Sequence, residues 1–119
     1  MKPQFYLKRA YEPAAKEDGY RVLVDRLWPR GISKEEAKID EWAKDLAPTG
    51  ALRKWYDHDP ARWDEFRKKY EAELKVNEAL HPFMEAHARQ HIFTLVYAAK
   101  EEALSNAVVL KAWLEKHWK

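Results

Sequence analysis

The sequence contains no cysteine among its 119 residues. That absence excludes disulfide scaffolds, thiolate metal sites, cysteine nucleophiles and thiol redox motifs. Long apolar runs are missing as well: the longest, residues 92–99, is too short to span a bilayer and contains Thr94. The first nine residues lack the apolar core of a signal peptide. We therefore expect a cytoplasmic protein that makes no contact with a membrane.

An excess of one charge is also missing, because 22 Lys and Arg face 20 Asp and Glu for a formal net charge of +2. This balance excludes a supercharged nucleic-acid tail but allows a local basic patch. Only three Gly and six Pro are present, and they form no linker. Aromatic residues are abundant, with six Trp, six Tyr and four Phe, and such side chains help a small domain to build a core. We predict a single α/β domain over residues 1–119.

Three segments have the patterns of β-strands. Residues 4–9 alternate between apolar and polar, whereas residues 21–25 and 92–97 contain continuous apolar runs typical of strands buried on both faces. Helical segments separate the last two. This arrangement predicts a small, mostly parallel sheet of about three or more strands, covered by helices, with a helical insert between strands two and three. The direction of the first strand stays open, because residues 9–21 are near the minimum length for a crossover.

Helix boundaries are marked by capping residues. Ser33 and Glu36 have capping-box spacing, and Asp59-Pro60 is typical of a helix start. From Ser33 we predict one helix up to Pro48, followed by a short helix over residues 51–56, a helix after Pro60, another after Asn77 and a last one over residues 105–118. The side chains that we expect to face inward are Ile39, Trp42, Ala43 and Leu46 in the first; Trp63, Phe66, Tyr70 and Leu74 in the third; Leu80, Phe83, Met84 and His87 in the fourth; and Val108, Val109, Ala112 and Trp113 in the last.

The segment from Asp25 to Gly31 is the strongest candidate for a binding site. It follows a predicted buried strand and leads into a capped helix, and ligands of open α/β sheets bind outside the carboxyl ends of the strands. Arg26 and Arg30 carry planar forks suited to phosphate or carboxylate, and Trp28 can stack on a ring. If all strands are parallel, Arg9 and Lys100 reach the same rim.

A structural role for this segment is the alternative. Arg26 and Arg30 would then pair with Asp25, Glu35 or Asp40 and hold the loop against the helices. Trp28 would only cover the core. The sequence leaves both interpretations open.

Other catalytic signals are weak. His58, between Asp57 and Asp59, is either a general base or part of a helix cap. His81 and Glu85, like His87 and His91, have only two-ligand spacing, so we expect no metal site and no cofactor. No nucleophile motif is present, and Asp25 is the candidate catalytic base of the binding segment. The sequence therefore assigns no enzyme class and no oligomeric state.

Several motifs resemble one family over nearly the whole chain. The longest is Asp18-Gly-Tyr-Arg-Val-Leu-Val-Asp-Arg-Leu-Trp-Pro-Arg-Gly31, and later matches include residues 46–48, 52–55, 66–70, 94–100 and 106–110. These motifs are similar to those of the bacterial and archaeal YeaO-like family, domain of unknown function family 488. The resemblance implies a small α/β fold and brings no catalytic assignment. Polar residues at matching positions are Arg9, Asp25, Arg26, Arg30, Arg53 and Lys100.

Our leading hypothesis is a domain that binds a small anionic ligand, phosphate-bearing or nucleotide-like. Its ligand-binding residues would be Arg9, Arg26, Trp28, Arg30, Arg53 and Lys100. A nucleic-acid-binding module that uses the basic helix from Arg62 to Lys69 is the second hypothesis. A protein-interaction module is the third.

Overall fold

The computed structural model describes residues 2–118 and contains a four-stranded sheet in the order β1-β4-β2-β3. Its strands are β1 (Gln4–Arg9), β2 (Tyr20–Leu23), β3 (Glu41–Trp42) and β4 (Ile92–Tyr97). Every pair of neighbouring strands is parallel, including β1 with β4. The predicted α/β class is therefore confirmed, and the open question about the first strand is answered. The strand predicted as third in the chain is β4, and it lies between β1 and β2.

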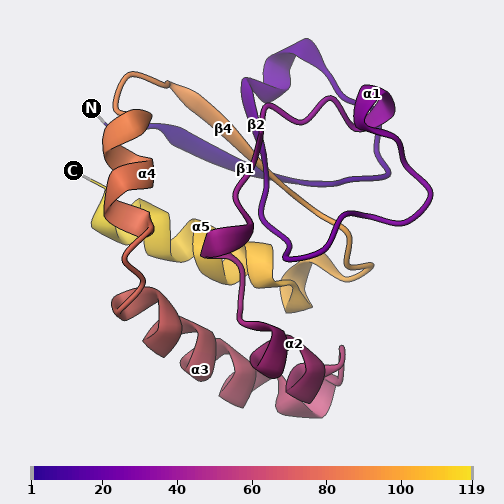
Figure 1. The fold of residues 1–119 in the computed structure, drawn as a ribbon, viewed down its shortest axis with the longest axis vertical. Coiled ribbons are helices and arrows are strands. Elements are labelled where there is room, and N and C mark those ends of the chain that lie inside the picture. The colour runs from indigo at the N-terminus through magenta and orange to yellow at the C-terminus, as the bar shows by residue number, and fades with distance from the viewer. Residues whose placement is uncertain (1, 119) are drawn as a thin grey trace.

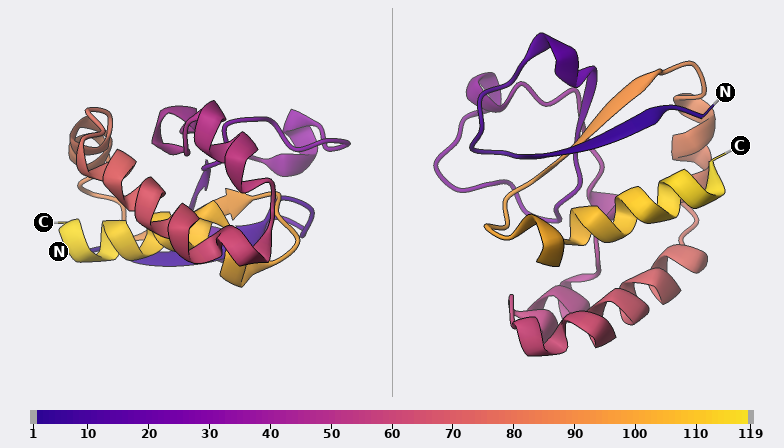
Figure 2. Two further views of the ribbon diagram at one scale, coloured as in Figure 1. Left: turned by 90° about the horizontal axis from the view of Figure 1, so that it is seen from below. Right: turned by 180° about the vertical axis from the view of Figure 1, so that it is seen from behind.

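Within residues 2–118 the helices are α1 (Lys34–Ala37), α2 (Gly50–Tyr56), α3 (Trp63–Lys75), α4 (Leu80–Ala86) and α5 (Asn106–His117), with 3₁₀ turns at Lys16–Asp18, Lys44–Leu46, Pro60–Arg62 and Glu102–Leu104. Helix α5 packs on β1 and β4, and α3 packs on α5. Figures 1 and 2 show α3 lying outside α5, with α2 beside one end of α3. The longer helices therefore build a layered cover for one side of the sheet.

The two faces of the sheet bury different clusters. Phe5, Val22, Phe93 and Leu95 belong to the main core, together with the inner sides of α2 to α5. Residues of opposite parity, Leu23 and Val96 with Ala10, form a second small cluster on the other face, against Trp28, Ile39 and Trp42. Because successive strand residues point to opposite faces, continuous apolar runs were needed to fill both.

The long helix predicted from Ser33 to Pro48 is wrong. Ser33 and Glu36 do form the predicted capping box, but α1 ends at Ala37 and Lys38 takes a left-handed conformation with φ 48°. Glu41 and Trp42 then pair with β2, and the N–H of Ala43 donates to Leu23 O at 2.9 Å. Pairing with the free edge of β2 therefore overrides a helical spacing of apolar residues.

The other helices agree with the predicted caps and faces, with differences in detail. Asp59 accepts a hydrogen bond from the N–H of Ala61, and the Asn77 side chain accepts one from the N–H of Ala79. In α3 the side chains of Phe66, Tyr70 and Leu74 are buried as predicted and that of Trp63 is half-buried. In α5 Ala112 is exposed, contrary to prediction, and the buried residues are Ala107, Val109, Leu110 and Leu114.

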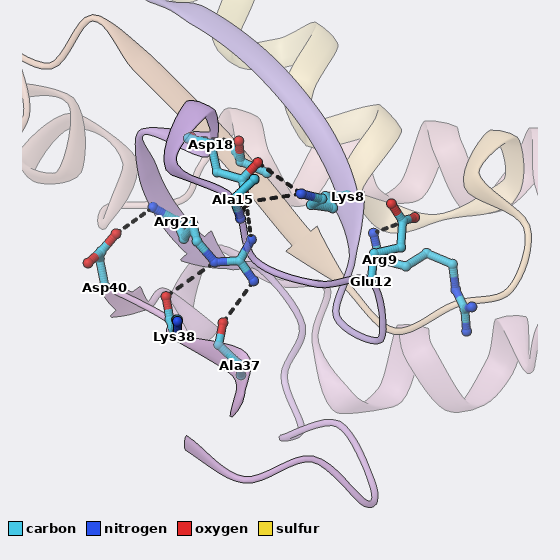
Figure 3. A network of polar contacts seen from close by, with 10 residues as sticks. Lys8, Arg9, Glu12, Ala15, Asp18, Arg21, Ala37, Lys38 and Asp40 are labelled. Carbon is cyan, nitrogen blue, oxygen red and sulfur yellow. Dashed lines mark hydrogen bonds and ion pairs between the residues drawn. The ribbon is translucent and has the colours of Figure 1, made fainter. Parts of the chain in front are cut away.

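A buried ion pair holds the second face of the sheet (Figure 3). Arg21, only 4% exposed, lies 2.6 Å from Asp18 Oδ2 and donates to the carbonyl oxygens of Ala37 and Lys38. Lys8 Nζ approaches the same carboxylate at 3.0 Å. Burial alone raises the pKa of Asp18, but the N–H of Ala15 and the two cations outweigh burial, so the pKa lies below its ordinary value.

Candidate functional site

A cleft of about 970 Å³ lies beyond the carboxyl ends of β2 and β4. Four parts of the chain supply most of its lining: residues 25–30 after β2, residues 98–101 after β4, the C-terminal half of α2 with the turn that follows, and the segment at the start of α5. Tyr11, Pro48 and Phe66 complete it. Parallel strands bring the first two segments to the same edge of the sheet. This is the edge where the sequence places the ligand site.

Asp25 lies on the polar floor of this cleft. Its Oδ2 accepts a hydrogen bond from the N–H of Ala98 at 2.9 Å, which joins the end of β2 to the end of β4. Beside it, Asn106 Nδ2 donates to Val24 O at 3.0 Å and fixes the start of α5. Burial raises the pKa of Asp25, although the N–H of Ala98, the Asn106 amide and the nearby His58 and Arg53 partly oppose this rise.

Positive charge predominates among the residues that line the cleft. The five cations are Arg26, Arg30, Arg53, Lys54 and Lys100, and the three acids are Asp25, Asp57 and Glu101. Arg30, Arg53 and Lys100 are exposed. Their side chains form no ion pair and no hydrogen bond with any residue between 2 and 118. Five of the six predicted ligand-binding residues, all except Arg9, line this one cleft.

Two of these five residues also hold the loop in place. Arg26 donates from Nε to Pro48 O at 2.8 Å, so its guanidinium fastens the loop to the entrance of α2. Trp28 donates from Nε1 to Ile32 O at 2.7 Å, and its ring packs edge-on against Trp42. Among the described residues, neither arginine of this loop pairs with Asp25, Glu35 or Asp40. The alternative of a structural role for this loop therefore applies in part. Arg26 and Trp28 hold the loop in place, but they bind backbone carbonyls and not the acids that the alternative named.

Arg9 lies at the predicted rim but outside the lining of the cleft. Its Nε donates to Ala99 O at 2.9 Å and its Nη2 to Ala98 O at 3.3 Å, while its guanidinium lies over the ring of Tyr11 at 5.1 Å. Arg9 therefore orders the segment that carries Lys100. Direct ligand binding by Arg9 stays a prediction.

The sequence matches the family described as "Inactive DUF488-N3 subclade" over residues 4–119. The chain belongs to the DUF488 family. It is 43% identical to the uncharacterized protein YeaO of Escherichia coli (strain K12) over 107 residues, which cover 90% of this chain and 93% of YeaO. It is 44% identical over 102 residues to the uncharacterized proteins Rv3073c of Mycobacterium tuberculosis (strain ATCC 25618 / H37Rv) and Mb3100c of Mycobacterium bovis, covering 86% of each chain. No solved structure matches.

Two findings concern further kinds of site in this DUF488 chain. Between residues 2 and 118, no helix combines the length and apolarity that crossing a membrane requires. Over the same residues, His, Asp and Glu side chains form no group of three or more that could hold a metal ion.

Sequence reasoning did not predict many of the residues that line the DUF488 cleft. Lys54 and Tyr56 come from α2, and Asn106 from the start of α5. His58, weighed above as a base or cap, lines the cleft and leaves capping to Asp59. His58 and the preceding Asp57 both have left-handed backbones, with φ of 53° and 46°. Neither residue is glycine, and no sequence motif predicts such a turn. The position of His58 in the cleft therefore follows only from the fold.

Proposed function

We propose that this cleft binds a small phosphate-bearing ligand such as a nucleotide. The observation that carries the proposal is that Arg30, Arg53 and Lys100, like Lys54, line one concavity without acidic partners among residues 2–118. Other surface cations lie beside acids, as Lys69 does beside Glu65 at 3.1 Å in α3. Within a cleft, unpaired charges of one sign focus the electrostatic field and concentrate anions.

Chemistry and size agree with a phosphate ester. Guanidinium groups bind phosphate oxygens through two parallel hydrogen bonds, and an ammonium group adds a flexible point charge. The cleft, about 970 Å³, is at the upper end of the usual range for small-molecule sites and far exceeds a phosphate ion. The description of the family as an inactive subclade supports binding without turnover for this chain.

The experiment is a titration of the isotope-labelled protein with inorganic phosphate and with adenosine monophosphate, followed by NMR. We expect amide shifts confined to residues 25–30, 53–58 and 98–106. Replacing Arg53 or Lys100 by Ser removes one charge-assisted hydrogen bond and should weaken binding of adenosine monophosphate about tenfold. The control is Arg89→Ser, which removes an exposed cation outside the cleft and should leave affinity unchanged. Shifts elsewhere, or equal effects of all three variants, would contradict the proposal.

Nucleic-acid binding by the basic helix has less support. Three of its cations lie beside acids one turn away: Arg62 beside Asp59 at 3.7 Å, Arg67 beside Glu71 at 3.6 Å, and Lys69 beside Glu65. These pairs neutralise the surface that would contact phosphates. The nucleic-acid hypothesis and the protein-interaction hypothesis stay predictions. Binding to single-stranded and duplex DNA that does not change with salt concentration would contradict the nucleic-acid hypothesis.

A further inference from the structure

The cleft has opposite charges at its two levels. Exposed cations, among them Arg53 and Lys100, surround its opening, whereas the half-buried carboxylate of Asp25 lies on the floor. No ion pair neutralises Asp25 within the described part of the chain. A wholly anionic ligand would be attracted to the opening and repelled by the floor.

Asp25 retains capacity to accept further hydrogen bonds. An ionised carboxylate offers about four lone-pair positions. The N–H of Ala98 occupies one of them at 2.9 Å, and the amide of Asn106 lies alongside. Both neighbours are neutral, and Asp25 lines the cavity. A ligand group that complements this carboxylate is therefore an N–H or O–H donor.

Ring-bearing side chains also line the cleft. Trp28, Tyr56 and Pro60 line the cleft, and Tyr56 is held with its hydroxyl donating to Leu104 O at 2.8 Å. Fixed rings of this kind favour a flat or apolar portion of a ligand. Together the cations, the rings and the carboxylate fit a molecule with an anionic group, a ring and a hydrogen-bond donor.

We infer that Asp25 is the specificity-determining residue of this cleft and selects phosphate esters whose far end carries an N–H or O–H donor. This inference rests on the proposed function, because the phosphate must first bind at the opening. It goes further by assigning the buried end of the ligand to one carboxylate. Nucleotides and sugar phosphates share this chemistry, through a base amine or a hydroxyl group.

The test uses two probes that differ in one donor, phenyl phosphate and 4-aminophenyl phosphate. Wild-type protein should bind the amino compound about tenfold more tightly, because a hydrogen bond to a charged acceptor in a sheltered site contributes that much. In Asp25→Asn, whose amide oxygen still accepts the N–H of Ala98, the preference should fall to about twofold or less, since a neutral acceptor replaces the carboxylate. In Asp25→Ala the preference should vanish and phenyl phosphate should bind at least as well as to wild type.

The control variant is Asp45→Asn, which removes an exposed carboxylate outside the cleft and should keep the tenfold preference. Thermal unfolding of each variant shows whether it is folded at the assay temperature. Equal binding of both probes to the wild type would overturn the inference while leaving the proposed function intact. Failure of every phosphate-bearing probe to bind would overturn both.

Two further probes identify the source of the donor. Wild-type affinity for adenosine monophosphate above that for both phenyl phosphate and ribose 5-phosphate, lost in Asp25→Asn, supports a base amine. Affinity for ribose 5-phosphate above that for phenyl phosphate, likewise lost in Asp25→Asn, supports a sugar hydroxyl. Unchanged affinity of both probes in Asp25→Asn would overturn the assignment of Asp25.

Discussion

The carboxylate of Asp25 and the backbone N–H of Ala98 connect the ends of two neighbouring parallel strands through a hydrogen bond of 2.9 Å. The same carboxylate forms the floor of the cleft, where its burial raises its pKa. One side chain therefore joins two strand ends and supplies a carboxylate to the cleft. Because the two roles respond differently to pH and to substitution, they are separable by experiment.

Replacing Asp25 by Asn should alter how stability depends on pH. A carboxyl group whose pKa is raised in the folded state favours folding fully below its ordinary pKa of 3.8, and this contribution is lost as pH rises through the folded-state value. Asp25→Asn carries no such charge, so its stability relative to wild type should increase from pH 3 to pH 7. Urea unfolding at several pH values measures this, and a constant difference would contradict a raised pKa.

Asp18 should show the opposite dependence on pH. Its pKa is lowered in the folded state, so its stabilising contribution is present above its ordinary pKa of 3.8 and is lost as pH falls through the folded-state value. At pH 7, Asp18→Asn leaves Arg21 buried without its partner and should cost about 3 kcal/mol of unfolding free energy. The deficit should shrink in acid. If it stayed constant down to pH 2, the ion pair would not be its cause.

Gly19 should tolerate no side chain. Its φ is 65°, and a Cβ added there would lie 2.6 Å from Ile92 O on the central strand. Gly19→Ala should therefore lower the unfolding free energy by about 2 kcal/mol or more. The matched control is Gly50→Ala in the first turn of α2, where a Cβ meets nothing within 4 Å and alanine should be neutral or stabilising. Chemical denaturation measures both, and equal effects would refute the steric argument.

Trp28 should contribute a specific hydrogen bond in addition to packing. Trp28→Phe keeps an aromatic ring against Trp42 but removes the donor to Ile32 O, and the expected loss is about 1 kcal/mol in unfolding free energy. Trp113→Phe is the comparison, because the Trp113 ring stacks on His117 and its indole N–H donates to no residue between 2 and 118. A larger effect at Trp113 would show that lost ring volume, and not the hydrogen bond, determines stability.

Local patterns predicted the elements that depend on local physics. The apolar runs of β2 and β4, the capping box at Ser33 and the buried face of α3 were all readable because each involves near neighbours in the chain. β3 was not, because it has only two residues and exists through hydrogen bonds to β2. Apolar residues at helical spacing also occur where no helix forms, and tertiary pairing then decides the structure.

In the cleft, too, some residues could be predicted from sequence and others could not. Asp25 and Lys100 were predicted to share one edge because parallel strands bring their carboxyl ends together. Asn106 and His58 were not predicted as lining residues, since each arrives through the docking of a helix that could not be positioned from sequence. The partners of Arg26 were missed because they are backbone carbonyls, which no side-chain pattern encodes.

The strand order has a consequence for synthesis on the ribosome. β1 pairs only with β4, and β2 pairs with β4 and the two-residue β3, so the residues before Ile92 can form no more than a minimal ladder. Strand β1 therefore remains unpaired, and β2 pairs at most with β3, until β4 has been synthesised. Helix α5, which covers β1 and β4, is made later still. Folding of this domain must therefore wait for β4 and α5, and truncated products that end before β4 should require chaperones or aggregate.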